Sequence, residues 1–472
     1  MNNKVVFPAL LLSSSCLLVA CGGGGGSSSS SSPSTSVAAA DRTVVGTVDG
    51  FGSVIVDGVH YSSTDTAFEI NDQVGVESQL RVGQRVVVQG SDDGVEGVAT
   101  RISYDADIRG PVVSVDAAAG TLVILGQTVL TDAMTVYRGV SLDTISVGQY
   151  LEVSGIRDGA GNLLASFIEV ESETEIELRG TISSLNEANN TFSINGLQVD
   201  YSSVITLELD EIALANGMLV EVEGELSSDV LVAAKIEQED MYHDYDGDIK
   251  LYGVISALDS DAGVMTVGGT EVLFSNSTKF DDGSVSDLSL NAKVKVEGEF
   301  NASGQLVAQE IDFEARVKLE LEGPVTALGD GTISVMGITA TVDTRTRVRD
   351  ERDDEYYFNL SSISTGDYVE LRLTIESDGT FRALKLERED DEGEVKITAP
   401  VESIDASAGT VTMLGITVDT SALVGLDLSL LQNGTYLEVE GTFDGSIVFA
   451  TDGEEDDEYE DHDGDSEGHD DD

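Results

Sequence analysis

Short runs in which apolar and polar residues alternate recur along the chain from about residue 42. An alternation with a period of two indicates β-strands that bury one face and leave the other in water. The first run of each series carries an apolar-x-Gly-x-apolar pattern, and its glycines are separated by 64, 70, 73 and 70 residues. We therefore predict one unit of about 70 residues, written about six times. These opening runs are Val44 to Val48, Ile108 to Val112, Leu178 to Ile182, Leu251 to Ile255, Leu321 to Val325 and, more weakly, Ile397 to Val401.

Each unit continues with the same succession of elements. A small-residue turn joins two alternating strands into a hairpin, as in Ser114 to Gly126. A glycine then precedes a third apolar strand, as Gly148 precedes Leu151 to Gly155, and Asn291 replaces this glycine in the fourth unit because asparagine also tolerates positive φ. A last strand carries an alanine, such as Ala165. About five short strands per unit predict an all-β fold of tandem small Greek-key barrels of the oligonucleotide/oligosaccharide-binding (OB) type. A continuous β-solenoid or sandwich is the alternative, although the repeat is long for a solenoid coil.

Two units depart from this pattern. The fifth has Leu371 to Ile375 without a glycine, and a charged insertion from Arg345 to Glu355. In the sixth, Ala450 runs into acidic residues, so no clear final strand is predicted there. The expected boundaries are a signal peptide at 1–20, a Gly/Ser-rich tether at 21–41, repeats at 42–105, 106–172 and 173–240, an acidic linker at 241–249, repeats at 250–314, 315–390 and 391–451, and a disordered acidic tail at 452–472.

This pattern resembles a domain family of unknown function that is repeated in tandem in bacterial lipoproteins and forms small OB-like β-barrel units. The resemblance covers roughly residues 42 to 450. Its motifs are strand residues and turn glycines, so it implies an architecture and transfers no catalytic residue.

The beginning of the chain has the features of a lipoprotein signal. Lys4 forms a basic region, and the apolar run from Phe7 to Ala20 is too short to span a bilayer. The sequence Leu18-Val19-Ala20-Cys21-Gly22 resembles a lipobox, so we predict export, cleavage before Cys21 and a lipid anchor on that cysteine. Glycine at position 22, directly after the cysteine, resembles the sorting pattern for the outer membrane. We therefore expect the protein at that membrane, on its periplasmic side or at the cell surface. The membrane is the expected partner, reached through Cys21, and a cationic or surface-polymer partner is left open.

Charge and cysteine content argue against several classes of protein. The formal net charge is −63, from 88 acidic and 25 basic residues, and such a field repels nucleic acid. The hydrophobic content of 40% distinguishes the chain from a disordered polyanion. Of its two cysteines, Cys16 leaves with the signal and Cys21 takes the lipid, so no disulfide is expected.

The acidic clusters are the strongest candidates for chemistry. Two strings alternate carboxylates around a glycine in the manner of calcium loops, with Asp244, Asp246 and Asp248 in one and Asp461, Asp463 and Asp465 in the other. Both lack the distant glutamate of an EF-hand, and a solvated acidic stretch is the simpler interpretation. Calcium is the one cofactor that these acidic strings indicate.

No sequence motif predicts an enzyme. Gly464-Asp465-Ser466-Glu467-Gly468 matches the nucleophile-elbow string, but no apolar strand precedes it. We expect a non-enzymatic exported lipoprotein with a structural, adhesive or display role. The alternative is a module that binds oligosaccharide, peptide or a divalent metal on its barrels.

Overall fold

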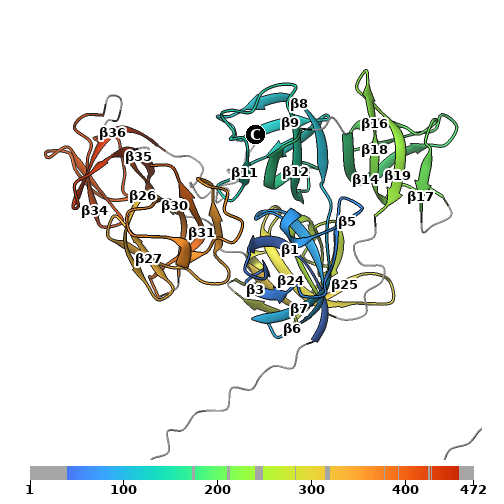
Figure 1. The fold of residues 1–472 in the computed structure, drawn as a ribbon, viewed down its shortest axis with the longest axis horizontal. Helices are drawn as coiled ribbons and strands as arrows, with labels where there is room; N and C mark the ends of the chain where they lie inside the picture. Colours follow the sequence, from blue (N-terminus) through green and yellow to red (C-terminus); the bar gives the residue numbers. More distant parts are fainter. Residues whose placement is uncertain are drawn as a thin grey trace, which may run out of the picture. The chain divides into compact units, whose positions relative to one another are not determined.

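The computed structural model describes the chain from residue 40 to residue 455, with short gaps (Figure 1). All its regular elements in this part are β-strands and three short 3₁₀ helices, so the described chain is all-β and built of repeated units. Within it, no helix is long and apolar enough to cross a membrane. The described residues are 40–172, 176–209, 213–239, 248–281, 283–313, 319–376, 378–391, 393–423, 426 and 428–455.

Every repeat has the same strand pairing. In repeat 2, for example, β8, β9 and β10 form an antiparallel series, β10 pairs in parallel with β13, and β12 pairs with both β13 and β8. The pairing of the five long strands therefore returns to the strand from which it began. In Figure 1 the strands of repeat 3, drawn in green, surround a common interior. Repeats 1 to 5 add a short strand parallel to their last strand, such as β11 beside β13.

The first strands of the repeats also pair with one another, and this joins the six repeats into three sheets. Repeats 2 and 3 share a sheet because β8 and β14 pair antiparallel, with Arg109 opposite Glu177. Repeat 2 comprises β8 (Ile108–Asp116), β9 (Thr121–Ile124), β10 (Gln127–Leu130), β11 (Val136–Arg138), β12 (Tyr150–Arg157) and β13 (Leu163–Val170). Repeat 3 comprises β14 (Ile176–Asn186), β15 (Thr191–Ile194), β16 (Leu197–Asp200), β17 (Thr206–Glu208), β18 (Leu219–Ser227) and β19 (Val230–Gln238).

Repeat 1 pairs with repeat 4, which is not its neighbour in sequence. Their first strands, β1 and β20, run parallel, with Arg42 opposite Asp248. Repeat 1 comprises β1 (Ala40–Gly50), β2 (Val54–Val56), β3 (Val59–Ser62), β4 (Ala67–Ile70), β5 (Gln73–Gly75), η1 (Glu77–Gln79), β6 (Arg85–Asp92) and β7 (Glu96–Tyr104). Repeat 4 comprises β20 (Asp248–Asp259), β21 (Val264–Val267), β22 (Thr270–Leu273), β23 (Lys279–Asp281), η2 (Val285–Asp287), β24 (Lys293–Phe300) and β25 (Leu306–Phe313).

Repeats 5 and 6 form the third sheet, through antiparallel pairing of β26 and β32. Their buried side chains belong to one continuous cluster, as do those of repeats 2 and 3. Repeat 5 comprises β26 (Leu319–Gly329), β27 (Thr332–Val335), β28 (Ile338–Thr341), β29 (Arg347–Asp350), η3 (Leu360–Ser362), β30 (Tyr368–Ile375) and β31 (Phe381–Glu389). Repeat 6 comprises β32 (Val395–Asp405), β33 (Thr410–Met413), β34 (Ile416–Asp419), β35 (Tyr436–Phe443) and β36 (Ile447–Glu455).

The glycine before the fourth long strand, which counts as the third apolar strand in the sequence pattern, has the conformation that the sequence indicated. Gly148 has a φ of 87°, which is accessible to glycine at little cost, and Asn291 occupies the same position in repeat 4 with a φ of 67°. Asn291 therefore keeps the positive φ of the glycine that it replaces, as predicted.

A second glycine lies inside the fourth long strand, at a β-bulge. In repeat 2 the register against the last strand shifts between Ser154 and Gly155. A Cβ atom on Gly155 would lie 2.2 Å from the carbonyl oxygen of Leu164. The same close approach, at 2.0 to 2.2 Å, occurs at Gly90, Gly224, Gly298 and Gly441. Repeat 5 keeps the register shift with Leu373 at this position.

Two boundaries and one insertion differ from the expected pattern. Repeat 6 does have a final strand: β36 pairs with both β34 and β35, and the acidic residues that obscured it continue the strand to Glu455, beyond the expected end at 451. β20 begins at Asp248, inside the expected linker, because the backbone of Asp248 pairs with β1. The charged insertion of repeat 5 contains the ordered strand β29.

Candidate functional site

Most of the site residues expected from the sequence lie outside the described residues. This holds for the lipidation candidate Cys21 and for Asp244, Asp246, Asp461, Asp463 and Asp465. Asp248 is described, at the start of β20, where its carboxylate lies 3.5 Å from the guanidinium of Arg42.

The polar face of several strands is buried, contrary to the expectation that it would face water. Glu152 and Glu177 are 4% and 5% exposed, and Glu221 is 3% exposed. The alternation correctly places these side chains outside the barrel interior of their own repeat. They are nevertheless buried because neighbouring repeats pack against that face, which a single repeat's pattern does not reveal.

Arg109 is the centre of a buried network that spans three repeats. Its guanidinium donates to Glu152 of its own repeat at 2.8 Å and to Glu177 of repeat 3 at 2.7 Å. Tyr104, at the end of repeat 1, donates its hydroxyl proton to the other oxygen of Glu152 at 2.5 Å. Charge-assisted hydrogen bonds of this kind are the strong ones. The network therefore fixes the junction of repeats 1, 2 and 3.

A carboxylate cluster lies beside this network, at the contact between repeats 1 and 3. Asp72, Glu221 and Glu223 each place one oxygen within 4.8 Å of the others. Asp72 occupies the turn between β4 and β5, and its backbone N–H donates to the carboxylate of Asp105 at 3.3 Å. The preceding residue, Asn71, accepts a hydrogen bond from the backbone of the repeat 1–2 linker. Two hydrogen bonds with the repeat 1–2 linker thus position the hairpin that carries Asp72.

Strand pairing in repeat 3 gathers the other members of the cluster on one face. Glu177 lies opposite Glu223 in the pairing of β14 with β18, and Lys235 lies opposite Glu223 in the pairing of β18 with β19. Lys235 bridges the cluster: its ammonium lies 2.5 Å from Asp72, 3.0 Å from Glu223 and 2.7 Å from Glu237. Although burial lowers the pKa of Lys235, these three hydrogen-bonded carboxylates raise it above its ordinary value.

Acidic groups outnumber basic ones around this cluster. Burial raises the pKa of Glu221 to about 10, and the charge of Glu177 adds to this effect. Burial also raises the pKa of Glu177 to about 8, against the lowering effect of Arg109, and that of Asp105 to about 7. The local field therefore favours any added positive charge, whether a proton or a cation.

A second carboxylate cluster, in repeat 5, differs from the first in the basic side chains that compensate its charge. Glu351, Glu387 and Glu389 also place oxygens within 4.8 Å of one another. Glu387 is paired with both Arg349 and Lys385, so its charge is compensated twice. Burial raises the pKa of Glu389 to about 10, and Glu389 shares a hydrogen bond with Glu370. Basic side chains therefore already compensate much of the charge of this cluster.

The junction of repeats 5 and 6 supplies a prediction about pH. Burial and a hydrogen bond with Glu320 raise the pKa of Glu322 to about 9, although Lys396 lies 3.9 Å away and lowers it. A raised pKa means that the folded state binds the proton more tightly than the unfolded chain. The stabilising contribution is therefore complete below the ordinary pKa of glutamate and is lost as the pH rises towards 9.

We expect the unfolding transition of repeats 5 and 6 to weaken between about pH 5 and pH 9. The Glu322→Gln variant should reduce this weakening by about 1–2 kcal/mol, because the amide cannot ionise. Calorimetric scans across this pH range measure the effect, with the exposed Glu440→Gln as control. Identical pH profiles for wild type and Glu322→Gln would refute the assignment.

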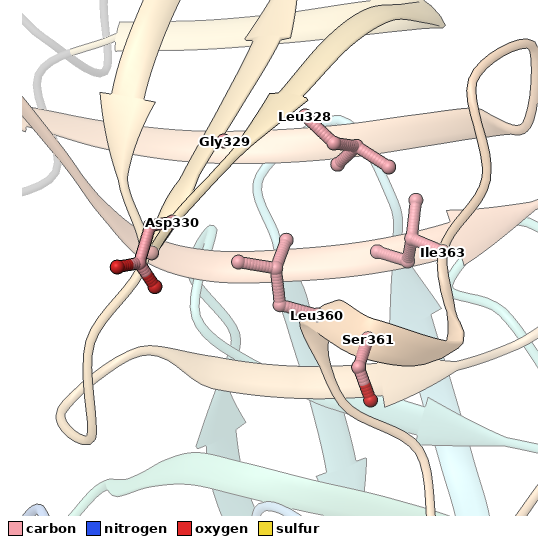
Figure 2. A pocket seen from close by; sticks show the side chains of 7 residues that line it. Leu328, Gly329, Asp330, Leu360, Ser361 and Ile363 are labelled. Atoms are coloured by element: carbon pink, nitrogen blue, oxygen red, sulfur yellow. The ribbon is translucent and has the colours of Figure 1, made fainter.

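The cavities in the described residues are shallow. One lies in repeat 5, between the turn that joins β26 to β27 and η3. Figure 2 shows Leu328, Leu360 and Ile363 facing one another there, with Asp330 and Ser361 turned outward. A second lies where repeats 1 and 5 meet, and the ring of Tyr356 stacks on Phe51 nearby at a centroid distance of 4.2 Å. The second depression follows from the packing of repeat 1 against repeat 5.

A family described as "Domain of unknown function (DUF5666)" matches the chain five times in tandem. The matched residues are 109–169, 179–237, 252–312, 322–387 and 398–452, which together exceed half of the chain. The five matches coincide with repeats 2 to 6, and repeat 1 has the same strand pairing. No curated protein matches the sequence.

Two solved structures are similar to parts of the chain. One is "drosophila Unr CSD456", with 14% identity and a TM-score of 0.17, covering 44% of this chain and 97% of that one. The other is a multidomain protein with nucleic acid binding domains from Streptococcus pneumoniae, with 11% identity and a TM-score of 0.12, covering 43% of this chain and 73% of that one. Likeness at this level supports no conclusion about fold or function.

Proposed function

The chain belongs to the DUF5666 family, and from this premise we propose that it is a non-enzymatic, lipid-anchored array of small β-barrels with a structural, adhesive or display role. The observation that carries this proposal is the pairing of first strands between repeats. Backbone hydrogen bonds between strands leave less freedom than flexible linkers would allow. Such joints suit a protein that must hold its surface at a fixed place.

The barrels are, on this proposal, of the OB type. Its support is the pairing order first, second, third, fifth, fourth and back to first, with the third and fifth strands parallel. An OB fold is a five-stranded Greek-key barrel that often binds ligands. In this chain, part of the outer surface of the barrels is occupied by other repeats, for example around Arg109. This favours a structural role over ligand binding at those faces.

The anchor is the lipid on Cys21. The sequence Leu18 to Gly22 supports it, and the Gly/Ser-rich segment that follows has the composition of a flexible tether. A lipidated cysteine with several acyl chains would hold the array at a membrane, since stable anchoring needs more than one chain. The outer membrane of a Gram-negative cell is the location that Gly22 favours.

Replacing Cys21 by serine is expected to abolish lipid labelling and to release the protein from the membrane fraction. Cells that express wild type or Cys21→Ser are grown with a radiolabelled fatty acid and then fractionated. Cys16→Ser is the matched control and should retain the label, because that residue lies in the part to be removed. Label that persisted on mature Cys21→Ser protein would disprove the anchor.

The alternative function is ligand binding. The cluster of Asp72, Glu221 and Glu223 favours a divalent cation as the ligand. It is compatible with the structural role, since a cation between two repeats would stiffen the array.

A further inference from the structure

We propose that Asp72, Glu221 and Glu223 form a binding site for a hard divalent cation such as Ca²⁺, which locks the β4–β5 hairpin of repeat 1 onto β18 of repeat 3. One oxygen from each residue lies within 4.8 Å of the other two, a spacing that one ion can bridge. Calcium takes six to eight oxygen ligands at about 2.3–2.6 Å, so water or further carboxylate oxygens would complete the shell.

The ammonium of Lys235 leaves part of the cluster uncompensated. It contacts Oδ2 of Asp72 and Oε1 of Glu223, so the second oxygen of each carboxylate is available to a cation. Its third contact is Glu237 rather than Glu221. Glu221 lies opposite Arg179 in the pairing of β14 with β18, but the guanidinium of Arg179 forms its ion pair with Glu239.

An unpartnered oxygen provides a second, independent observation. The side chain of Glu221 is 3% exposed. Next to it, Oε1 of Glu177 is buried and has no hydrogen-bond partner, while Oε2 accepts from Arg109. Buried polar atoms without partners are rare in folded proteins because the lost solvation costs free energy. An ion bound between these strands would supply the missing partner.

The charge balance points the same way. Beside the three proposed ligands lie two more acids, the half-buried Asp105 and the buried Glu177, and the nearby basic groups have other partners. Arg179 is engaged by Glu239 at 2.6 Å, and Arg109 by Glu152 and Glu177. A divalent ion would reduce an excess of negative charge that the side chains alone do not cancel.

The ligands come from repeats that are not adjacent in sequence, so binding and docking are coupled. Asp72 belongs to the hairpin of repeat 1, whereas Glu221 and Glu223 belong to β18. An ion that binds only when the hairpin is docked stabilises the docked state by mass action. Removing the ion should therefore loosen the hairpin without unfolding either barrel.

The test is hydrogen exchange of the full-length protein in calcium chloride and in chelator, read in peptides that cover residues 67–79 and 217–227. At a free calcium concentration tenfold above the dissociation constant, exchange that requires undocking should slow about tenfold in the wild type. Weak extracellular calcium modules bind at about 10⁻⁴–10⁻³ M, so the titration extends into the millimolar range. Exchange in these peptides that ignores calcium in the wild type would overturn the proposal.

Variants separate the cation site from the alternative that Lys235 and bound protons suffice. Glu221→Gln should remove the calcium response of both peptides, and Asp72→Asn should do the same should Glu221→Gln fail to fold. Lys235→Met should tighten calcium binding about tenfold or more, since a competing positive charge within about 4 Å is lost. Glu389→Gln in the repeat 5 cluster is the matched control and should keep the wild-type response. A response that survives in Glu221→Gln, or calcium affinity unchanged in Lys235→Met, would assign the effect to another site.

Discussion

Replacing Arg109 by methionine is expected to destabilise the junction of repeats 2 and 3 by about 3–5 kcal/mol, the cost of breaking a buried ion pair by removing one partner. Methionine preserves much of the side-chain volume, so the loss is electrostatic rather than a cavity. Glu152 and Glu177, which are 4% and 5% exposed, would be left without the guanidinium that both contact. The unfolding transition that contains these repeats should move down by roughly 10 °C or more.

The matched control is Arg101→Met, which removes an equivalent ion pair at the surface. The side chains of Arg101 and Glu69 are 45% and 38% exposed, and pairs in water contribute at most about 1 kcal/mol. Calorimetric scans of both variants measure the difference, and they should be repeated at about pH 5, where protonation of Glu177 softens the effect of Arg109→Met. Similar small shifts for the two variants would mean that the Arg109 network is not buried in solution.

The repeat and its strands were predictable because they depend on local patterns. The alternation in runs such as Val44 to Val48 marks strands, and the positive φ of Gly148 and Asn291 follows from residues that tolerate it. These features depend on interactions within about 70 residues. The all-β class and the tandem family were therefore accessible from the sequence alone.

The candidate site was not predictable because it depends on contacts between repeats. The sequence places Glu221 and Glu223 on the polar face of a strand, and it gives no sign that Asp72 of repeat 1 lies beside them or that Glu221 is buried. The pairing of β1 with β20 likewise joins the first repeat to the fourth, which no spacing in the chain indicates. Acidic runs near Asp244 attracted attention through their density, whereas Asp72 is an ordinary turn residue in the sequence.

In repeat 6, the acidic composition after Ala450 led to a wrong prediction. The acids after Ala450 resemble a solvated tail, but the backbone of this segment pairs with β35 up to Glu455. Backbone hydrogen bonds require no particular side chain, so a strand whose side chains point to solvent can be strongly acidic. Repeat 5 illustrates the converse: Leu373 stands where five repeats have glycine, and the register shift is retained. The structure offers no simple reason for that tolerance.

The bulge glycine nevertheless leads to a sharp prediction in repeat 2. Gly155→Ala places a methyl group 2.2 Å from the carbonyl oxygen of Leu164, far inside van der Waals contact, and the obstacle is backbone that cannot rotate away. Overpacking of a well-packed site costs about 1–3 kcal/mol, and we expect the upper end because the clash lies between two paired strands. The transition of repeats 2 and 3 should move to lower temperature by about 5–10 °C.

Gly126→Asn is the control for Gly155→Ala in the same repeat. Gly126 has a φ of 71° and no atom within 4 Å of a Cβ placed there, and asparagine tolerates this conformation, so the loss should stay below about 1 kcal/mol. Calorimetry measures both shifts. If Gly155→Ala melted like the wild type, strand β12 would have to accept a side chain at the bulge as repeat 5 does at Leu373. The recurrence of glycine at this position in five repeats would then reflect something other than the close approach of the two strands.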